Sequence, residues 1–363
     1  MDKSFWKDKK VMITGHTGFK GSWLSIWLKR IGANVVGYSL PPPTNPSLFE
    51  IANVNRGITS IEGDIRNFEY LKSTIDRYRP EIIIHMAAQA LVRYGYENPL
   101  ETYSTNVMGT VNILESVRQV NGVRVLVIVT SDKCYDNKEW CWGYRENDTL
   151  GGRDPYSSSK ACAEMVTTAY CKSYFSHNDV AIASVRAGNV IGGGDWSEDR
   201  LIPDIMKAFM EHRPVIIRSP QSIRPWQYVL DPLYGYLLLA ERLWSNGQEY
   251  AGGWNFGPPK EDAKPVSWIV EEIKKMWGDD ASWELDNYSG NPKEALCLKL
   301  DCSKAKHLLG WSPNLNLHIA LKWIVDWYRA YMQNENMQKY SNDEIIRYEN
   351  ILAVKGGHEL HKV

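Results

Sequence analysis

The chain has 363 residues, of which 44% are hydrophobic and 23% are charged, and its formal net charge is −1. This near-neutral balance argues against a nucleic-acid-binding protein, which would carry a basic surface. At roughly 100–200 residues per domain, the length predicts two domains.

The first chemical signature is a strand that runs into a glycine-rich turn. Residues 9–14 predict a short buried strand, and glycines follow it at three-residue spacing (15, 18 and 21). A helical pattern up to Gly32 and a second strand over 34–38 complete the unit. Glycines in this context let the helix N-terminus approach a pyrophosphate closely. We therefore expect a dinucleotide site formed by Gly15, Thr17, Gly18, Phe19, Lys20 and Gly21.

Strands and helices continue to alternate along the chain. Strands are predicted over 58–61, 81–85, 124–129 and 180–185, and helices over 68–78, 99–120, 155–175, 200–212 and 317–331. This alternation predicts an α/β fold of the Rossmann type, a doubly wound parallel sheet with helices on both faces. Asn106, inside the helix over 99–120, is expected to make a structural hydrogen bond or to contact solvent.

Ser131, Asp132 and Lys133 follow closely after the end of the strand over 124–129. Further on, Asp154 and Pro155 form an N-cap and a first helical position, so Tyr156 and Lys160 share one helix face. An ammonium beside a phenol is expected to lower the phenol pKa, which would provide a base near neutral pH. These hydroxyl, carboxyl and amine groups predict a proton-transfer site.

The glycine spacing and the Tyr-x-x-x-Lys pair resemble those of the extended short-chain dehydrogenase/reductase family. Within it, Ser131-Asp132-Lys133 resembles the strand end of nucleotide-sugar 4,6-dehydratases of the CDP-glucose type, whereas the dTDP-glucose type carries Thr-Asp-Glu. The resemblance runs from about residue 9 to residue 328. It implies NAD as cofactor, with further contacts from Ser39, Asp64, Ile65, Ala87, Ala88, Tyr156 and Lys160.

The resemblance also implies roles for the catalytic residues. Tyr156, supported by Ser131 and Lys160, would remove the proton of the sugar 4-hydroxyl during oxidation at C4. Asp132, if buried and protonated, would protonate the departing C6 hydroxyl. Lys133, if neutral, would remove the C5 proton. The substrate would be CDP-glucose, and the product a 4-keto-6-deoxy sugar nucleotide of the kind used for dideoxyhexose and lipopolysaccharide O-antigen biosynthesis.

Substrate contacts are expected from the chain after the catalytic helix. Asn189 and Arg224 match family positions at the sugar-nucleotide phosphates, and a guanidinium suits a diphosphate. The complete expected set is Gln89, Asn189, Arg200, Leu201, Ile202 and Arg224. In dTDP-type relatives an arginine follows near residue 291, but Pro292-Lys293-Glu294-Ala295 stands here, so no such residue is carried over.

The expected organisation is a nucleotide-binding domain over 1–180 to which the chain returns at about 225–255. A smaller α/β substrate domain would use 181–224 and 256–335, followed by a charged tail over 336–363 at the surface or a subunit contact. By resemblance, the helices over 99–120 and 155–175 would form a homo-oligomer, a dimer or a tetramer.

Cellular context follows from patterns that are missing. No run approaches the ~20 apolar residues of a membrane-spanning helix. No signal peptide is visible, and six cysteines stand at no metal-ligand spacing, so we expect a cytoplasmic protein with reduced thiols and no metal.

Two alternative functions are weighed against a dehydratase. Another nucleotide-sugar enzyme, such as a dTDP- or GDP-sugar dehydratase or a C4-epimerase, would share the glycine loop and the tyrosine–lysine pair. An epimerase has no use for Asp132 and Lys133. A non-catalytic NAD-binding sensor would need none of the catalytic groups.

Overall fold

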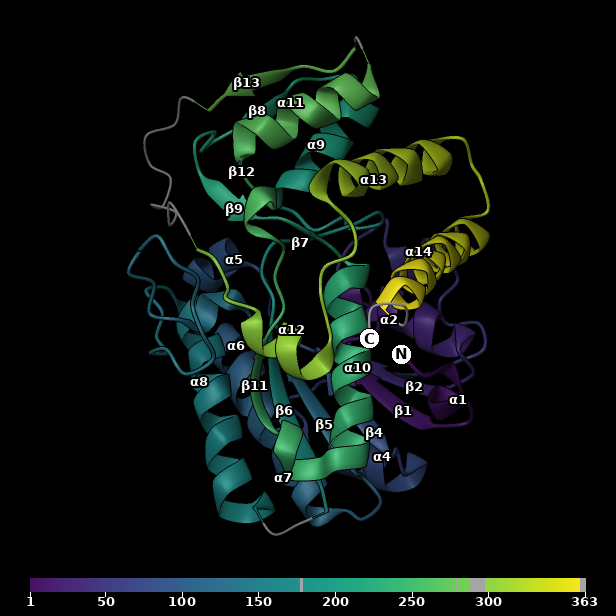
Figure 1. The fold of residues 1–363 in the computed structure, drawn as a ribbon, viewed down its shortest axis with the longest axis vertical. Helices are drawn as coiled ribbons and strands as arrows, with labels where there is room; N and C mark the ends of the chain where they lie inside the picture. Colours follow the sequence, from purple (N-terminus) through teal and green to yellow (C-terminus); the bar gives the residue numbers. More distant parts are fainter. Residues whose placement is uncertain (177–178, 279, 287–297, 360–363) are drawn as a thin grey trace.

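The computed structural model describes residues 1–176, 179–278, 280–286 and 298–359 (Figure 1). Its centre is a seven-stranded sheet with the order β11-β6-β5-β4-β1-β2-β3 and every pair parallel. The predicted Rossmann-type sheet is therefore confirmed. The strands are β1 (Lys10–Thr14), β2 (Asn34–Ser39), β3 (Thr59–Glu62), β4 (Ile82–His85), β5 (Val125–Val129), β6 (Ala181–Arg186) and β11 (Gly252–Asn255).

Successive residues of the central strands face opposite sides of the sheet, and each side has its own core. Val11 and Ile13 join a core with α2 (Phe19–Arg30) and α10 (Leu230–Asn246), whereas Met12 joins another core with α4 (Phe68–Tyr78) and α7 (Gly109–Gln119). Because both faces are covered, the strands read as continuous apolar runs rather than as an alternation. Helix α8 (Pro155–Tyr170) packs against α7 and continues into the π-helical η3 (Cys171–Phe175).

The helix predicted over 99–120 is interrupted at its centre. It consists of α6 (Pro99–Tyr103), the π-helical η1 (Ser104–Met108) and α7. Short π segments inside α-helices are frequent at functional sites. Asn106 lies in η1, where its side chain makes buried hydrogen bonds, so the structural interpretation of this residue is confirmed.

A second group of elements lies beyond the carboxyl ends of the sheet, in the upper half of Figure 1. Short strand pairs join β9 with β12, β8 with β13 and β7 with β10. The elements are β7 (Val190–Ile191), α9 (Leu201–Met210), β8 (Val215–Ile217), β9 (Ile223–Pro225), β10 (Gln227–Tyr228), η5 (Lys260–Asp262), β12 (Ala263–Pro265), α11 (Val266–Trp277), β13 (Trp283–Leu285) and α13 (Leu317–Met332).

Shorter elements complete the described chain. They are α1 (Lys3–Trp6), α3 (Leu48–Ile51), α5 (Val92–Glu97), η2 (Asp132–Cys134), η4 (Gly247–Tyr250) and α12 (Ser303–Leu309). Two of the predicted domain limits need correction. The limit at 180 precedes β6, which is paired on both sides within the sheet, and α12 contacts α10 and β11 although 256–335 was assigned to the second domain. The division into two domains otherwise stays a prediction.

The C-terminal segment corrects another prediction. Instead of a charged tail, the segment forms α14 (Met337–Glu359), which packs against α2 and α13. Ile345 and Tyr348 are fully buried, and the Glu349 carboxylate accepts from the Trp27 indole at 3.0 Å and pairs with Lys3 at 2.9 Å. The charged residues of this segment concealed a buried face, because Glu349 is paired with Lys3 and Arg30 of the remaining fold.

Candidate active site

The expected cofactor loop is shaped by close backbone contacts. Gly15 has a φ of +77°, and a Cβ there would stand 2.7 Å from the Ala87 nitrogen. A Cβ on Gly21 would stand 2.1 Å from the Gly15 oxygen, so neither position accepts a side chain. Gly18 precedes α2 and offers no side-chain cap, which leaves the first helical amides for an anion. This cradle fits a dinucleotide.

Other residues expected at the cofactor surround this cradle. The Thr17 hydroxyl bonds the Ser39 hydroxyl at 2.8 Å at the end of β2, and Phe19 begins α2. Asp64 is held by Arg66, with 2.6 Å between Oδ2 and Nη2, and this arginine lowers the pKa of the Asp64 carboxyl.

Ile65 follows β3, and Ala87 and Ala88 follow β4. All three therefore lie at the carboxyl edge of the parallel sheet. Ile65 is buried against Gly109 and offers the cofactor no exposed side chain, whereas Ala87 and Ala88 are partly exposed. The Thr14 hydroxyl accepts from the amides of Met86 and Ala87 at 3.1 and 3.2 Å, which fixes the backbone after β4.

Lys20 has surroundings that the glycine pattern did not predict. Burial, followed by the positive charges of Lys160 and Arg200, lowers the pKa of Lys20 to about 7, whereas Asp132 acts in the opposite direction. The ammonium therefore faces the catalytic cluster as well as the glycine loop.

Ser131, Asp132 and Lys133 form a tight turn at the end of β5. The Ser131 hydroxyl accepts from the Lys133 amide at 3.2 Å and donates to Asp132 Oδ1 at 3.0 Å. Asp132 is 1% exposed, and its Oδ2 finds no hydrogen-bond partner within the described part of the chain. A Cβ on Gly188 would lie 1.9 Å from Oδ2, so this carboxyl group occupies space that only glycine leaves. The carboxyl group is thus shielded from solvent.

Tyr156 and Lys160 lie on the buried face of α8, beside the end of β5. The Asp154 carboxylate caps the helix by accepting from the Ser157 amide at 2.9 Å, which confirms the predicted helix start. Burial lowers the pKa of Lys160 to about 8, and its ammonium donates to the Val129 carbonyl at 3.4 Å.

The pKa of Tyr156 differs from the expectation. Burial raises it to about 12, and the groups that lower it most are the Ser131 hydroxyl, by a hydrogen bond, and the Arg200 charge. The expected lowering by Lys160 is not found: the groups that lower the pKa of Tyr156 are Ser131 and Arg200. Arg200 is the cation that reaches this phenol.

Five of the expected substrate residues lie in two places. Arg200, Leu201 and Ile202 lie at the start of α9, whereas Asn189 lies just before β7 and Arg224 lies on β9. Arg200 precedes α9 and pairs with the buried Asp195 at 3.0 Å, and the Leu201 backbone opens the same helix. Ile202 is 3% exposed, so its side chain belongs to the core. Asn189 adopts a φ of +46°, and Arg224 lies on β9, where its guanidinium donates to the Ile223 carbonyl at 3.1 Å.

Gln89 is partly buried, and its side-chain amide is bonded within the protein. Its amide nitrogen donates to the Leu91 carbonyl at 3.0 Å and to the Thr102 hydroxyl at 2.9 Å, and its amide oxygen accepts from the Leu91 amide. Both amide hydrogens of Gln89 are therefore used within the protein, and a substrate group that accepts from them would have to replace one of these bonds. Pro292-Lys293-Glu294-Ala295 lies outside the described residues.

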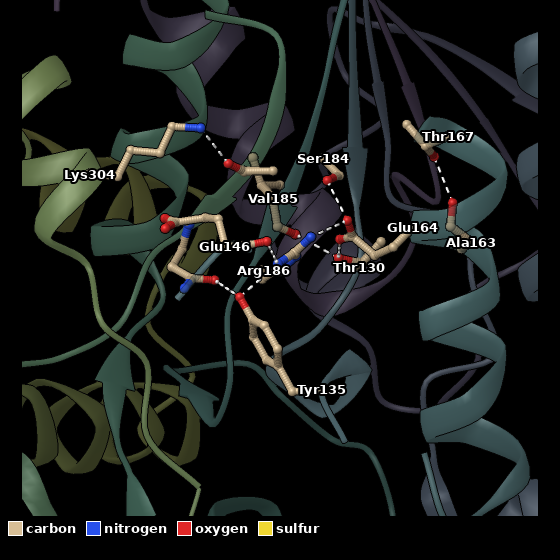
Figure 2. Close-up of polar contacts among 12 residues, drawn as sticks. Thr130, Tyr135, Glu146, Ala163, Glu164, Thr167, Ser184, Val185, Arg186 and Lys304 are labelled. Atoms are coloured by element: carbon tan, nitrogen blue, oxygen red, sulfur yellow. Dashed lines mark hydrogen bonds and ion pairs between the residues drawn. The ribbon is translucent and has the colours of Figure 1, made fainter. Parts of the chain in front are cut away.

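Sequence reasoning missed one buried ion pair behind this site. Glu164 of α8 and Arg186 at the end of β6 approach to 2.7 Å, and they are 2% and 4% exposed (Figure 2). The sequence did place Glu164 one helical turn after Lys160, and therefore on the same face of α8. That spacing does not identify Arg186 as its partner.

The parallel sheet with its glycine cradle, and a tyrosine, a lysine and a buried acid at its carboxyl edge, define a class of nucleotide-dependent enzymes. The family described as GDP-mannose 4,6 dehydratase matches residues 12–322, and this chain belongs to it. The resemblance to nucleotide-sugar dehydratases of the extended short-chain dehydrogenase/reductase family is thereby confirmed.

Particular relatives refine the comparison. The chain is 56% identical over 353 residues to a CDP-glucose 4,6-dehydratase of Salmonella typhimurium, with 96% of this chain and 98% of the relative covered. It is 25% identical to the human dTDP-D-glucose 4,6-dehydratase, covering 91% of this chain and 93% of that protein. A solved dTDP-glucose 4,6-dehydratase from Bacillus anthracis, in complex with NAD, shares the fold with a TM-score of 0.74 at 22% identity, covering 91% and 99% of the two chains.

Proposed function

We propose that this protein is an NAD-dependent hydro-lyase that converts CDP-D-glucose to CDP-4-keto-6-deoxy-D-glucose. The observation that carries the proposal is the 56% identity, over nearly the whole of both chains, with the Salmonella relative of that activity. The Ser131-Asp132-Lys133 turn supports it, because an elimination needs an acid and a base beyond the oxidation machinery.

The glycine cradle and the α2 N-terminus hold the pyrophosphate of NAD in this proposal. When bound, the dinucleotide supplies a hydride acceptor for C4 of the sugar and a hydride donor for C6. Tyr156 removes the proton of the 4-hydroxyl, while Ser131 holds the phenol oxygen and Arg200 stabilises its negative charge. Because burial raises the pKa of Tyr156 to about 12, nearby positive charge is needed before it can act as a base.

Elimination follows oxidation at C4, because a 4-ketone makes the C5 proton acidic. Lys133 removes that proton, and Asp132 donates a proton to the C6 hydroxyl, which leaves as water. Asp132 is buried and its Oδ2 has no hydrogen-bond partner among the described residues, so this oxygen is available to the C6 hydroxyl. The balance is one water lost, with the hydride taken from C4 placed on C6.

The nucleotide half of the substrate is proposed to lie along the second group of elements. Arg224 and Asn189 contact the diphosphate, and the α9 N-terminus, formed by Arg200, Leu201 and Ile202, provides backbone amides for it. Gln89 stays in the proposal only as a residue that exchanges an internal hydrogen bond for a substrate hydroxyl.

We further propose a homodimer or tetramer in the cytoplasm, with a product that serves 6-deoxy and dideoxyhexose sugars of the O-antigen. Large apolar side chains are exposed on the two helices expected at the subunit contact: Leu100, Met108, Met165 and Tyr174 are 87%, 50%, 53% and 54% exposed. Apolar groups in one stretch of surface favour a protein partner. Among the described residues, no helix is both long and apolar enough to cross a membrane.

One experiment tests the reaction. The purified protein is incubated with NAD and CDP-glucose in deuterated water, and the sugar is followed by NMR. We expect a new C6 methyl signal and deuterium at C5, because C5 loses its proton to the enzyme and regains one from solvent. An epimer without a methyl group would indicate a C4-epimerase, and no change would indicate a sensor; either result would overturn the proposal.

A further inference from the structure

The buried carboxylate of Glu164 has no role in the reaction described above, yet its surroundings are unusually complete. Glu164 Oε2 accepts from the Ser184 hydroxyl and from Arg186 Nη2, each at 2.7 Å. Glu164 Oε1 accepts from the Thr130 hydroxyl. A buried charge is tolerated only when it is paired and hydrogen-bonded, and this carboxylate meets that requirement with one cation and two hydroxyl groups.

These partners come from three different elements. Glu164 lies on α8, Thr130 directly follows β5, and Ser184 and Arg186 lie on β6. Figure 2 shows the carboxylate of Glu164 facing the guanidinium of Arg186 and the hydroxyl groups at the strand ends. The hydrogen bonds of Glu164 therefore hold α8 against β5 and β6, close to Ser131, which directly follows Thr130.

Arg186 extends the network away from α8. Its Nη1 donates to the Tyr135 hydroxyl at 2.7 Å and to the Glu146 carbonyl at 3.0 Å, and Tyr135 in turn donates to Asn255 Oδ1 at 2.8 Å. Asn255 ends the edge strand β11. The segment that follows the catalytic turn is thus held by the same guanidinium that pairs with Glu164.

Glu164 also follows Lys160 by four residues, so the two side chains share one face of α8. The titratable or charged groups that act on Lys160, or on which Lys160 acts, come from four elements: Glu164 on α8, Cys134 in η2, His85 at the end of β4 and Lys20 in α2. After burial, which lowers the pKa of Lys160, the largest effect on this pKa comes from the charge of Glu164. That charge favours the ammonium form.

We propose that Glu164 is a positioning residue for the reaction: paired with Arg186 and bonded to Thr130 and Ser184, it fixes α8, and with it Lys160, against the strand ends. The inference rests on the proposed function only for its effect on turnover. It does not require Glu164 to touch substrate or cofactor.

The test compares Glu164→Gln with Thr167→Val. The glutamine keeps the shape of the side chain and removes its charge. Thr167 is a matched control, because its buried hydroxyl lies on the same helix and donates to the Ala163 carbonyl within that helix at 2.7 Å (Figure 2). Lysines are labelled with carbon-13 at Cε, the Lys160 signal is identified by its loss in Lys160→Arg, and its titration is followed by NMR.

We expect Glu164→Gln to lower the titration midpoint of Lys160 by about one pH unit, since an opposite charge nearby favours the charged form. Thr167→Val should leave the midpoint unchanged. With CDP-glucose, kcat of Glu164→Gln should fall by about 10–100-fold with little change in KM, and the alkaline limb of its pH profile should move to lower pH. A midpoint that is equal in both variants and the wild type would overturn the proposal.

Glu164→Gln leaves the Arg186 guanidinium without its carboxylate and can fail to fold. Glu164→Asp then decides, because it keeps a charge beside Arg186 but withdraws it by one methylene group. We expect a smaller shift of the Lys160 midpoint in the same direction; no shift would contradict the proposal. If the wild-type protein does not turn over CDP-glucose, the proposed function fails, whereas the titration still tests Glu164.

Discussion

Two regions of the molecule use buried carboxyl groups for opposite purposes. At the carboxyl edge of the sheet, Asp132 keeps an oxygen without a partner among the described residues, beside a phenol and several cations. At the contact between α10 and α14, the buried Asp231 accepts through Oδ1 from the Tyr348 hydroxyl and the Asn314 amide, each at 2.7 Å, and its Oδ2 likewise has no partner among the described residues. The two groups differ in their neighbours: Asp132 lies beside the Tyr156 phenol, whereas Asp231 binds the helix α14 to the fold.

The difference predicts a division of labour. Substitutions at the sheet edge should change the rate and leave stability nearly intact, because the polar groups there are poised for a ligand. Substitutions at the α10–α14 contact should change stability and leave the rate intact. Four substitutions test this contrast.

Tyr156→Phe should lower kcat by about 10²–10⁴-fold, because it removes the base for the 4-hydroxyl proton. Turnover of CDP-glucose measures this effect, and circular dichroism checks that the fold persists. Tyr170→Phe is the control, since that hydroxyl lies on the same helix and only reaches Glu115 at 3.4 Å. Similar rates in both variants would show that Tyr156 is not the base.

Lys133→Ala should lower turnover by about 10²-fold and abolish deuterium incorporation at C5, because the base for that proton is lost. Oxidation at C4, followed by cofactor absorbance in a single turnover, should continue. Lys138→Ala serves for comparison, since its exposed ammonium pairs with Asp136 at the surface. Retained exchange at C5 in Lys133→Ala would assign the base elsewhere.

Asp231→Asn should change the pH dependence of stability. Burial raises the pKa of Asp231 to about 6 from an ordinary 3.8, so the folded wild-type protein loses stability as this group ionises between about pH 4 and pH 6. The variant lacks that loss. Its free energy of unfolding should therefore rise relative to the wild type across this range, by at most about 3 kcal/mol.

Urea unfolding at several pH values measures the difference. Asp326→Asn, which removes an exposed carboxylate paired with Lys322, controls for a general charge effect. A constant difference between Asp231→Asn and the wild type would show that Asp231 does not titrate in the folded protein.

Tyr348→Phe should lower the free energy of unfolding by about 1–2 kcal/mol, because Asp231 loses one of its donors. Its kcat should stay within about twofold of the wild-type value. Tyr340→Phe, on the same helix, removes a hydroxyl with no hydrogen bond among the described residues. A large loss of activity in Tyr348→Phe would break the contrast between the two regions.

Much of the sheet and of its catalytic edge was predictable from local patterns. The glycine spacing at 15–21, the N-cap at Asp154 and the apolar runs of β4 and β5 each depend on residues close together in the chain. The same holds for Tyr156 and Lys160, which share a face because they are one helical turn apart.

The features that escaped prediction depend on residues far apart in the chain. Arg186 meets Glu164 across 22 positions, and Tyr348 meets Asp231 across 117. A charged residue that is paired inside the protein looks the same in sequence as one at the surface, so Glu349 suggested a solvated tail. The pKa of Tyr156 depends likewise on burial and on Arg200, and neither could be derived from the Tyr-x-x-x-Lys spacing.

The hydrogen bond of the Glu349 carboxylate joins two parts of the chain that are synthesised at different times. The carboxylate accepts from the indole of Trp27, which is 322 positions earlier in the chain. At ~5–20 residues per second, a ribosome makes the second residue on the order of 15–60 s after the first. The helix of the glycine loop is thus among the first parts made, but its outer side stays uncovered until the final helix arrives. Throughout that interval the Trp27 indole lacks the Glu349 carboxylate and the Tyr348 ring that contact it in the finished fold.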